Sequence, residues 1–460
     1  MRSMSKPLKI ALICGLAVTA TACSTVQRVW PFGGDGDAPE SVASAGERIS
    51  ILEFEQNLSP SAELAGRDFF VPGPQAITAW PVPGGNVEQS LEHVIAAPDF
   101  SVAWRRNIGD GGSRMTQVTA TPVAADGRIF VMDGEARVSA VDANSGDIIW
   151  QTSVRPDGRD RAFGGGVAVS GDRVFVTSGY RLVTALDARS GAVLWTTPFD
   201  APIHGAPTVS GGRVFAVDVD NQVIALDAES GSLTWSYQAI SEPARLMRAS
   251  SPAVTGDTVI APFSSGEVSA IRAANGQELW TQVLSRTSRT NALSEIRDIA
   301  GRPAISRGVV YAVSHSGLLS AMDLRTGQPA WQAPLAGVNA PWVAGDVVYA
   351  VSKAGELIVL NRQNGEVYWI RNVNEGRTRT EGGWFFGVGK RTVRPVWSGP
   401  ILASNRLVLV NSDGQAVAYD HKTGEEVASL DLGAPAFIAP IAYNGALYVV
   451  TDNGQLVSIR

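Results

Sequence analysis

The sequence predicts an all-β protein, an eight-bladed β-propeller, from a repeated motif, from the strands that precede it and from an incomplete last repeat. The motif is about ten residues long and returns at a period of about 40 to 45 residues, the length of a four-stranded propeller blade. Its clearest copy is Ala225–Trp235, and the other copies are 140–150, 185–195, 270–280, 321–331, 359–369 and 418–428. Repetition at a fixed period indicates units that stack on one another to bury their apolar faces.

Each copy has the residues of a strand, a tight turn and a second strand. In the clearest copy Val223, Ala225 and Asp227 alternate as in a strand, and Gly231 supplies the positive φ that a tight turn needs. Trp235, on the outgoing strand, is placed to cover the hairpin. Aspartate holds the turn position in several copies, as Asp142, Asp187, Asp227, Asp323 and Asp420. One such carboxylate per repeat favours a structural turn cap over a catalytic role.

Two more strands precede each hairpin, so every repeat is expected to have four strands, A to D. A β-branched and aromatic run, strand B, stands at 127–133, 172–178, 212–218, 308–314 and 346–352. Proline-containing runs such as 206–209 and 251–254 come before it as strand A.

The last blade is predicted to combine the two ends of the repeat region. After the seventh copy, where Ala428 stands in place of tryptophan, three strands are predicted, at 439–443, 446–451 and 455–459. The segment Phe100–Trp104 resembles a strand D with its tryptophan and has no hairpin before it. We expect this segment to close the ring, because the first and last blades then leave no open edge between them.

The first residues indicate export and lipid attachment. A basic region precedes the apolar stretch 10–20, which is too short to span a bilayer, and small residues then lead to Cys23. This order resembles a bacterial lipoprotein signal, so we predict that residues 1–22 are a signal peptide and that Cys23 carries acyl chains. The alternative is an ordinary secretory signal with an incidental cysteine. Ser24 is not the acidic residue that retains lipoproteins in the inner membrane, which favours the periplasmic face of the outer membrane.

Residues 23–99 are predicted to be a tether and an N-terminal extension, followed by the propeller at 100–460. The turn-rich run 79–85 is expected to lie against the propeller wall, with Trp80 packed there. We expect a truncation that removes residues 24–95 to leave a folded ring.

Charge and cysteine content argue against several kinds of site. The net charge of −6 over 460 residues gives no basic footprint for nucleic acid. Because Cys14 lies inside the predicted signal, the mature chain keeps Cys23 alone and can form no internal disulfide. The 4 histidines lie in different repeats without ligand spacing, and no catalytic signature motif is present. We therefore predict no catalytic residues, no metal site and no cofactor.

Three long connections between blades are the candidate binding elements, because all D-to-A connections of a propeller leave from one face. They are 239–249, 285–301 and 372–396. The first two flank the fourth blade and are therefore neighbours on that face. The third carries the aromatic run Trp384–Phe386, and it is either a lid packed over the central channel or a binding element.

The predicted partner-binding residues come from the first two connections. Leu246 and Met247 are an apolar pair beside Arg248, and the second connection offers Arg297 and Asp298. An apolar anchor surrounded by charge is the pattern of a protein-docking surface.

The motif Ala-x-Asp-x-x-x-Gly-x-x-x-Trp is similar to that of the PQQ-type propellers, and with its lipoprotein-type leader the chain resembles the BamB family. These are lipoproteins of the β-barrel assembly (BAM) machinery of the outer membrane, and the resemblance covers residues 100–460. It implies a non-enzymatic scaffold that binds the POTRA region of a BamA-like protein and assists the insertion of β-barrel proteins. Other BAM subunits are further expected partners, and unfolded outer-membrane proteins are candidate clients.

The resemblance points to the same two connections. In the family, one connection carries an apolar-apolar-Arg string before a strand start, which Leu246, Met247 and Arg248 match with a one-residue shift. The other carries an aspartate that falls on Asp298, and a second aspartate whose position is held by Ala300 here. That departure implies a weaker electrostatic half of the contact.

Two other functions remain open on this fold. One is a propeller lipoprotein that binds peptidoglycan or another envelope polymer. The other is a periplasmic PQQ-dependent dehydrogenase, although such enzymes are longer and carry an adjacent cysteine pair that this mature chain lacks.

Overall fold

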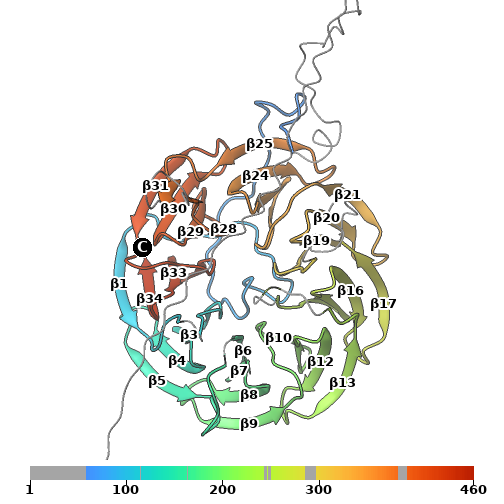
Figure 1. Ribbon diagram of the computed structural model, residues 1–460, viewed down its shortest axis with the longest axis vertical. Helices are drawn as coiled ribbons and strands as arrows, with labels where there is room; N and C mark the ends of the chain where they lie inside the picture. The colour runs from blue at the N-terminus through green and yellow to red at the C-terminus, as the bar shows by residue number, and fades with distance from the viewer. Residues whose placement is uncertain are drawn as a thin grey trace, which may run out of the picture. The chain divides into compact units, whose positions relative to one another are not determined.

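Eight four-stranded antiparallel sheets are arranged around one axis as the blades of a propeller (Figure 1). The structure is a computed structural model that describes residues 58–113, 116–162, 164–242, 246, 250–284, 297–381 and 391–460. In each blade strand A lies nearest the axis and strand D lies at the rim. The described residues form strands and turns and no helix, so the prediction of an all-β, eight-bladed propeller is confirmed.

The first four blades follow the chain in A-to-D order. Blade 1 contains β2 (Val123–Ala125), β3 (Arg128–Met132), β4 (Arg137–Asp142) and β5 (Ile148–Ser153). Blade 2 contains β6 (Gly165–Ser170), β7 (Arg173–Ser178), β8 (Leu182–Asp187) and β9 (Val193–Pro198). Blade 3 contains β10 (Thr208–Ser210), β11 (Arg213–Val217), β12 (Gln222–Asp227) and β13 (Leu233–Gln238). Blade 4 contains β14 (Ala253–Thr255), β15 (Thr258–Pro262), β16 (Glu267–Arg272) and β17 (Glu278–Val283).

The remaining blades include the junction of the ring. Blade 5 contains β18 (Ala304–Ser306), β19 (Val309–Val313), β20 (Leu319–Asp323) and β21 (Pro329–Ala333). Blade 6 contains β22 (Trp342–Ala344), β23 (Val347–Val351), β24 (Glu356–Asn361) and β25 (Val367–Asn372). Blade 7 contains β28 (Trp397–Ala403), β29 (Arg406–Asn411), β30 (Gln415–Asp420) and β31 (Glu426–Asp431). Blade 8 contains β32 (Ile441–Tyr443), β33 (Ala446–Thr451), β34 (Gln455–Ile459) and β1 (Val102–Asn107).

The ring closes through β1, as the sequence predicts. This strand pairs antiparallel with β34, from Asn107 opposite Gln455 to Val102 opposite Ile459. It begins two residues later than the predicted segment Phe100–Trp104 and runs three residues further. The first and last blades are therefore joined within one sheet, and neither presents a free edge at the junction.

The turn between strands C and D is held by the repeated aspartate. In blade 3, Asp227 Oδ1 accepts the backbone N–H groups of Glu229 at 3.1 Å and Ser230 at 2.8 Å. These hydrogen bonds, with one from the Ser230 hydroxyl, hold the pKa of Asp227 below its ordinary value. Gly231 follows at φ +72°, the left-handed region that glycine adopts without strain. The structural role predicted for the motif aspartates is confirmed.

The motif tryptophan covers the hairpin of the next blade rather than that of its own blade. A Cβ atom added to Gly231 of blade 3 would lie 2.5 Å from carbon atoms of the Trp195 ring of blade 2. The ring therefore occupies the space that a side chain at this position would need. Its indole N–H donates to the Ala228 carbonyl at 3.2 Å. The same tryptophan–glycine contact occurs at seven junctions, as Trp104–Gly146, Trp150–Gly191, Trp195–Gly231, Trp235–Gly276, Trp280–Gly327, Trp331–Gly365 and Trp369–Gly424.

The remaining junction, between blades 7 and 8, explains why Ala428 stands where the seventh motif tryptophan would be. Strands C and D of blade 8 are β34 and β1, which are not consecutive in the chain. Blade 8 therefore has no hairpin turn on which a tryptophan from blade 7 could pack. Trp104, on β1, packs instead on Gly146 of blade 1 and completes the series across the closure.

The N-terminal extension crosses the middle of the ring (Figure 1). The run 79–85, which was expected against the propeller wall, lies in the middle of the ring, whereas the start of the extension contacts the rim, where Ser61 N–H donates to the Val367 carbonyl of β25 at 2.8 Å. Trp80 exchanges two backbone hydrogen bonds with Ala124 of β2, at 2.7 and 2.8 Å. Its side chain is fully buried and stacks on Trp342 of β22, with ring centroids 6.5 Å apart. The packing predicted for Trp80 is confirmed, but at the centre of the ring.

The extension reaches the strand A region of every blade in turn. The partners of its hydrogen bonds, in blade order, are Ala124, Val169, Thr208, Val254, Ile305, Trp342, Leu402 and Gly445. Strand A is the inner edge of each blade, and an unpaired edge in a protein interior costs free energy. The extension pairs with these edges at the ends where the A–B and C–D turns lie.

Candidate docking face and axial funnel

The propeller has two faces that differ in their connections. The A–B and C–D turns lie on one face, as shown by the hydrogen bond from Ala143 N–H to the Gly127 carbonyl. The B–C turns lie with the start of the D–A connections on the other, as the bond from Val154 N–H to the Ala136 carbonyl shows. We call the second face the connection face. Every long connection singled out from the sequence leaves from it.

The structure brings together the two connections that flank blade 4. The backbone N–H of Leu246, in the first connection, donates to Asp298 Oδ2, in the second, at 2.8 Å. The carbonyl of Asp298 in turn accepts the N–H of His315 at 2.9 Å. The adjacency predicted for these two connections is therefore confirmed.

The predicted docking residues differ in exposure. Arg297 is exposed and Leu246 is half-buried, but Asp298 is only 5% exposed. The side chain of Asp298 thus faces the Leu246 backbone and does not form part of an exposed charged rim. Met247 and Arg248 lie outside the described residues, as does Cys23.

The third long connection is attached to blade 7 at its base. Its strands β26 (Arg379–Glu381) and β27 (Arg391–Val393) pair antiparallel. Arg379 forms an ion pair with Asp413 at 2.7 Å. Arg377 forms a second with Glu426, also at 2.7 Å. The aromatic run Trp384–Phe386 lies outside the described residues, so its predicted roles remain open.

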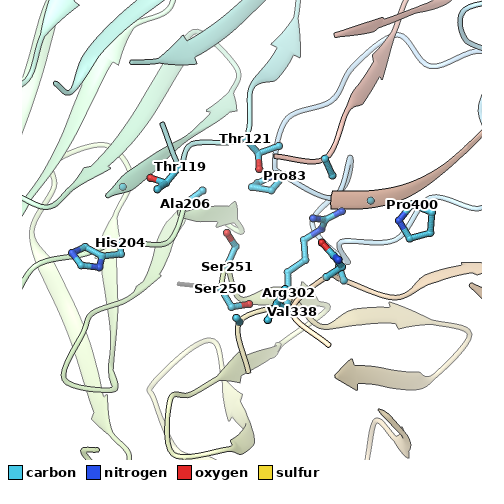
Figure 2. Close-up of a pocket in the computed structure, with 17 residues that line it drawn as sticks. Pro83, Thr119, Thr121, His204, Ala206, Ser250, Ser251, Arg302, Val338 and Pro400 are labelled. Carbon is cyan, nitrogen blue, oxygen red and sulfur yellow. The ribbon is translucent and has the colours of Figure 1, made fainter. Parts of the chain in front are cut away.

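A pocket, which we call the funnel, is lined by residues at or near the starts of the inner strands, on the side of the connection face; Figure 2 shows these residues around it. Its lining includes the residue that precedes the blade-opening proline in seven blades, namely Thr121, Ala206, Ser251, Arg302, Ala340, Gly399 and Ala439. Pro83, from the N-terminal extension, lines the same space, so the extension forms the inner end of the funnel. Six of these seven equivalent positions hold small or hydroxyl side chains, and only Arg302 is long and charged.

An apolar cavity of about 490 Å³ adjoins the funnel on the connection face. The two spaces share Thr119 and Val338 in their linings. The apolar part of the cavity wall is formed by Val118, Leu246, Val338, Phe437 and Ile438. Sequence reasoning did not find these central residues. The sequence signal that could have found them is the residue before the opening proline, which is small or carries a hydroxyl in six blades and is Arg302 in a seventh.

Two buried histidines join the extension to blade 7. His93 Nδ1 lies 2.7 Å from the Pro72 carbonyl, and its Nε2 accepts the N–H of Asn405 at 2.9 Å. The His421 ring lies 6.1 Å from that of His93, and its Nδ1 lies 2.8 Å from the Asn405 carbonyl. Burial lowers the pKa of both imidazoles, because it disfavours the charged form.

Within the described ranges, no group of three or more His, Cys, Asp or Glu side chains is placed to hold a metal ion. The same ranges contain no helix long and apolar enough to cross a bilayer.

A family model described as "Outer membrane protein assembly factor BamB" matches residues 134–371 and 380–460 of this chain. The outer membrane protein assembly factor BamB of Escherichia coli (strain K12) is 28% identical over 366 residues, which are 78% of this chain and 88% of that protein. The protein of the same name from Vibrio cholerae is 30% identical over 374 residues, which are 79% of this chain and 92% of that protein.

Solved structures show the same fold. BamB from Moraxella catarrhalis superposes with a TM-score of 0.65 at 19% identity, covering 78% of this chain and 99% of that chain. The quinohemoprotein alcohol dehydrogenase from Comamonas testosteroni superposes with a TM-score of 0.63 at 16% identity, covering 83% and 80%. Likeness at such identity concerns the fold alone, which proteins of different function share.

Proposed function

The chain belongs to the BamB family of outer membrane protein assembly factors, and we propose that it is a non-enzymatic scaffold lipoprotein of the BAM machinery. In this proposal it is anchored by acyl chains on Cys23 to the periplasmic face of the outer membrane. It docks on the POTRA region of a BamA-like protein, works with other BAM subunits and assists the insertion of β-barrel proteins. Unfolded outer-membrane proteins are its candidate clients.

The observation that carries the docking proposal is the contact between Leu246 and Asp298. A protein interface needs a contiguous patch of surface with an apolar anchor near its centre. The 2.8 Å hydrogen bond from Leu246 N–H to Asp298 Oδ2 joins two connections that are far apart in the sequence. It supports one surface made of both connections, with Leu246 and Met247 as anchor and Arg248 and Arg297 around it.

The buried position of Asp298 changes the role that we propose for it. A carboxylate that accepts a backbone N–H in a poorly solvated place fixes the geometry of the chain it holds. We therefore propose that Asp298 positions Leu246 for the partner. On this view, the loss of the family's second aspartate at Ala300 affects the partner contact less than the resemblance alone implied.

Binding of the purified chain to purified POTRA domains tests the proposal. Replacing both Leu246 and Met247 by alanine should weaken the complex by well over tenfold, because truncating interface anchors costs about 2 kcal/mol or more. The thermal unfolding of this loop variant should stay nearly unchanged. Arg248→Glu should also weaken binding, whereas Arg379→Glu, in the third connection, should matter less. Wild-type binding by the double variant would exclude this surface and favour the connection around Trp384.

A further inference from the structure

The axial funnel has the features of a binding site that does not depend on the proposed docking. Its described lining comes from all eight blades and from Pro83 of the extension. Because the extension occupies the ends of the inner strands on the opposite face, a ligand would enter from the connection face. Figure 2 shows Thr119, Thr121, His204, Ser250, Ser251 and Arg302 around this space.

The polar groups of the funnel are arranged for an anion. Among its described lining residues Arg302 is the one arginine or lysine, and none is an aspartate or glutamate. Ser250 is 8% exposed, and its hydroxyl oxygen has no hydrogen-bond partner among the described residues. The Thr119 hydroxyl is buried in the same way. Buried hydroxyls without partners are rare in folded proteins, and a bound acceptor would satisfy them.

Arg302 differs from the residues at the equivalent position of six other blades. The repeat places an equivalent residue before the opening proline of seven blades, and the other six are glycine, alanine, serine or threonine. Small residues there leave the axis open, while the Arg302 side chain extends inward over Gly84 of the extension. A guanidinium binds oxyanions such as carboxylates and phosphates with two parallel N–H groups.

Two of the aspartates near the funnel accept backbone N–H groups. Asp298 and Asp218 line a smaller hollow that shares Ser250 and His204 with the funnel. Asp298 accepts the Leu246 N–H, and Asp218 accepts the N–H groups of Asp220 and Gln222. Asp452 lies on the described wall of the adjoining apolar cavity, where burial raises its pKa.

We propose that the funnel binds a carboxylate that carries an apolar group. The carboxylate lies against Arg302, Ser250 and Thr119, and the apolar group occupies the adjoining cavity lined by Val118, Val338, Phe437 and Ile438. The free C-terminus of a polypeptide ending in an apolar residue and a medium-chain fatty acid share this chemistry. The volume of the cavity, about 490 Å³, falls within the range of small-ligand sites, so the cavity has room for one such apolar group.

Calorimetric titration of the purified full-length chain tests this site with three probes. They are a hexapeptide ending in leucine with a free carboxyl group, the same peptide as its C-terminal amide, and octanoate. The free-acid peptide or octanoate should bind, and the amide should bind at least tenfold more weakly than the acid, because it lacks the charge that Arg302 recognises. The tighter of the two acids identifies the source, and competition between them shows that they share one site.

Variants locate the site. Arg302→Gln and Ser250→Ala should each weaken binding of the acid, by at least tenfold for the first. Arg325→Gln removes the same charge from an exposed turn on the other face of blade 5 and should leave binding unchanged. Val338→Trp should block entry of the acid into the site. This variant tests the location of the site if Arg302→Gln does not fold. Equal binding of acid and amide, no binding of either acid, or wild-type binding by Ser250→Ala and Val338→Trp together would overturn the proposal.

Discussion

Gly231 and Trp195 show how single residues hold neighbouring blades together. The glycine turns the chain at φ +72°, and the tryptophan of the preceding blade occupies the space where a side chain would be. One residue therefore satisfies a local requirement of the backbone and a packing requirement between blades. This pair recurs at seven junctions, so the motif glycine is needed for packing between blades as well as for the turn.

Replacing Gly231 by alanine should destabilise the protein more than the same change at Gly212. Both glycines belong to blade 3 and have almost the same conformation, with φ of +72° and +73°. An added Cβ meets no atom within 4 Å at Gly212, but meets the Trp195 ring at 2.5 Å at Gly231. We expect Gly212→Ala to cost about 1 kcal/mol through backbone strain and Gly231→Ala about 1–3 kcal/mol more. Denaturant unfolding measures both, and equal losses would contradict the packing role.

His93 and His421 should make the stability depend on pH in mildly acid solution. Burial lowers the pKa of both in the folded state, while the unfolded chain titrates near the ordinary value of about 6.5. Below that pH the unfolded state binds more protons than the folded state. The contribution of the two histidines to the free energy of unfolding is therefore fully present above about pH 6.5 and declines as the pH falls. A proton on His93 Nε2 would also face the N–H of Asn405.

The measurement compares unfolding at pH 7 and pH 5. We expect the wild-type chain to lose more stability between these values than a variant with glutamine at both histidines. Arg189→Gln, at an exposed turn far from the pair, serves as the control and should keep the wild-type dependence. A double variant with unchanged pH dependence would show that other groups cause the loss.

Among the elements of the fold, the N-terminal extension has the largest effect on the interior. Its segment from Trp80 to Ala97 contributes fully buried side chains to the core shared with blades 1, 6, 7 and 8. It also supplies hydrogen-bond partners to inner strands around the ring. These contacts argue against the expectation that a chain without residues 24–95 keeps a folded ring.

Trp80→Ala should be strongly destabilising. The side chain is fully buried and stacked on Trp342, and truncating a buried tryptophan typically costs about 3–5 kcal/mol. Phe70→Ala, in the same extension, is the matched control, because Phe70 is 62% exposed and should cost less than about 0.5 kcal/mol. Calorimetry on both variants separates them. A small effect at Trp80 would restore the view of the extension as a dispensable tether.

At the scale of the whole molecule, the closed ring holds the blades in place while the connections on one face vary. Closure by β1 and the central path of the extension fix the blades relative to one another. The connections on one face are then free to differ in length and chemistry, as loops on a rigid scaffold commonly do. The proposed docking surface and the proposed carboxylate site both belong to that face, and the proposed lipid anchor precedes the extension.

Replacing Cys23 by serine should abolish stable attachment to the outer membrane. Lasting attachment needs more than one acyl chain, and the cysteine is the proposed site of acylation. We expect Cys23→Ser to accumulate uncleaved or soluble in the periplasm when membranes are fractionated. Cys14→Ser, inside the predicted signal peptide, is the control and should fractionate as wild type does. Unchanged outer-membrane recovery of Cys23→Ser would exclude the lipoprotein proposal.

The sequence by itself determined the blades, their number, their turns and the strand that closes the ring. Each of these depends on residues close together in the chain, such as Asp227 and Gly231, or on a pattern repeated at a fixed period. The adjacency of the connections around blade 4 followed as well, because the order of blades in a ring is the order of repeats. Family membership could be inferred from the same repeats.

The tertiary structure alone decided what the tryptophans, the extension and Asp298 contact. Trp195 acts on the next blade, which no local pattern indicates, and the extension has no repeat from which its path could be read. Asp298 is in sequence a charged residue of a long loop, and only the approach of Leu246 buries it as a hydrogen-bond acceptor. Arg302 can be compared with the equivalent residues of six other blades only when the ring places all seven around one axis. These contacts join residues far apart in the chain, so their energies depend on the assembled ring and leave no local signal in the sequence.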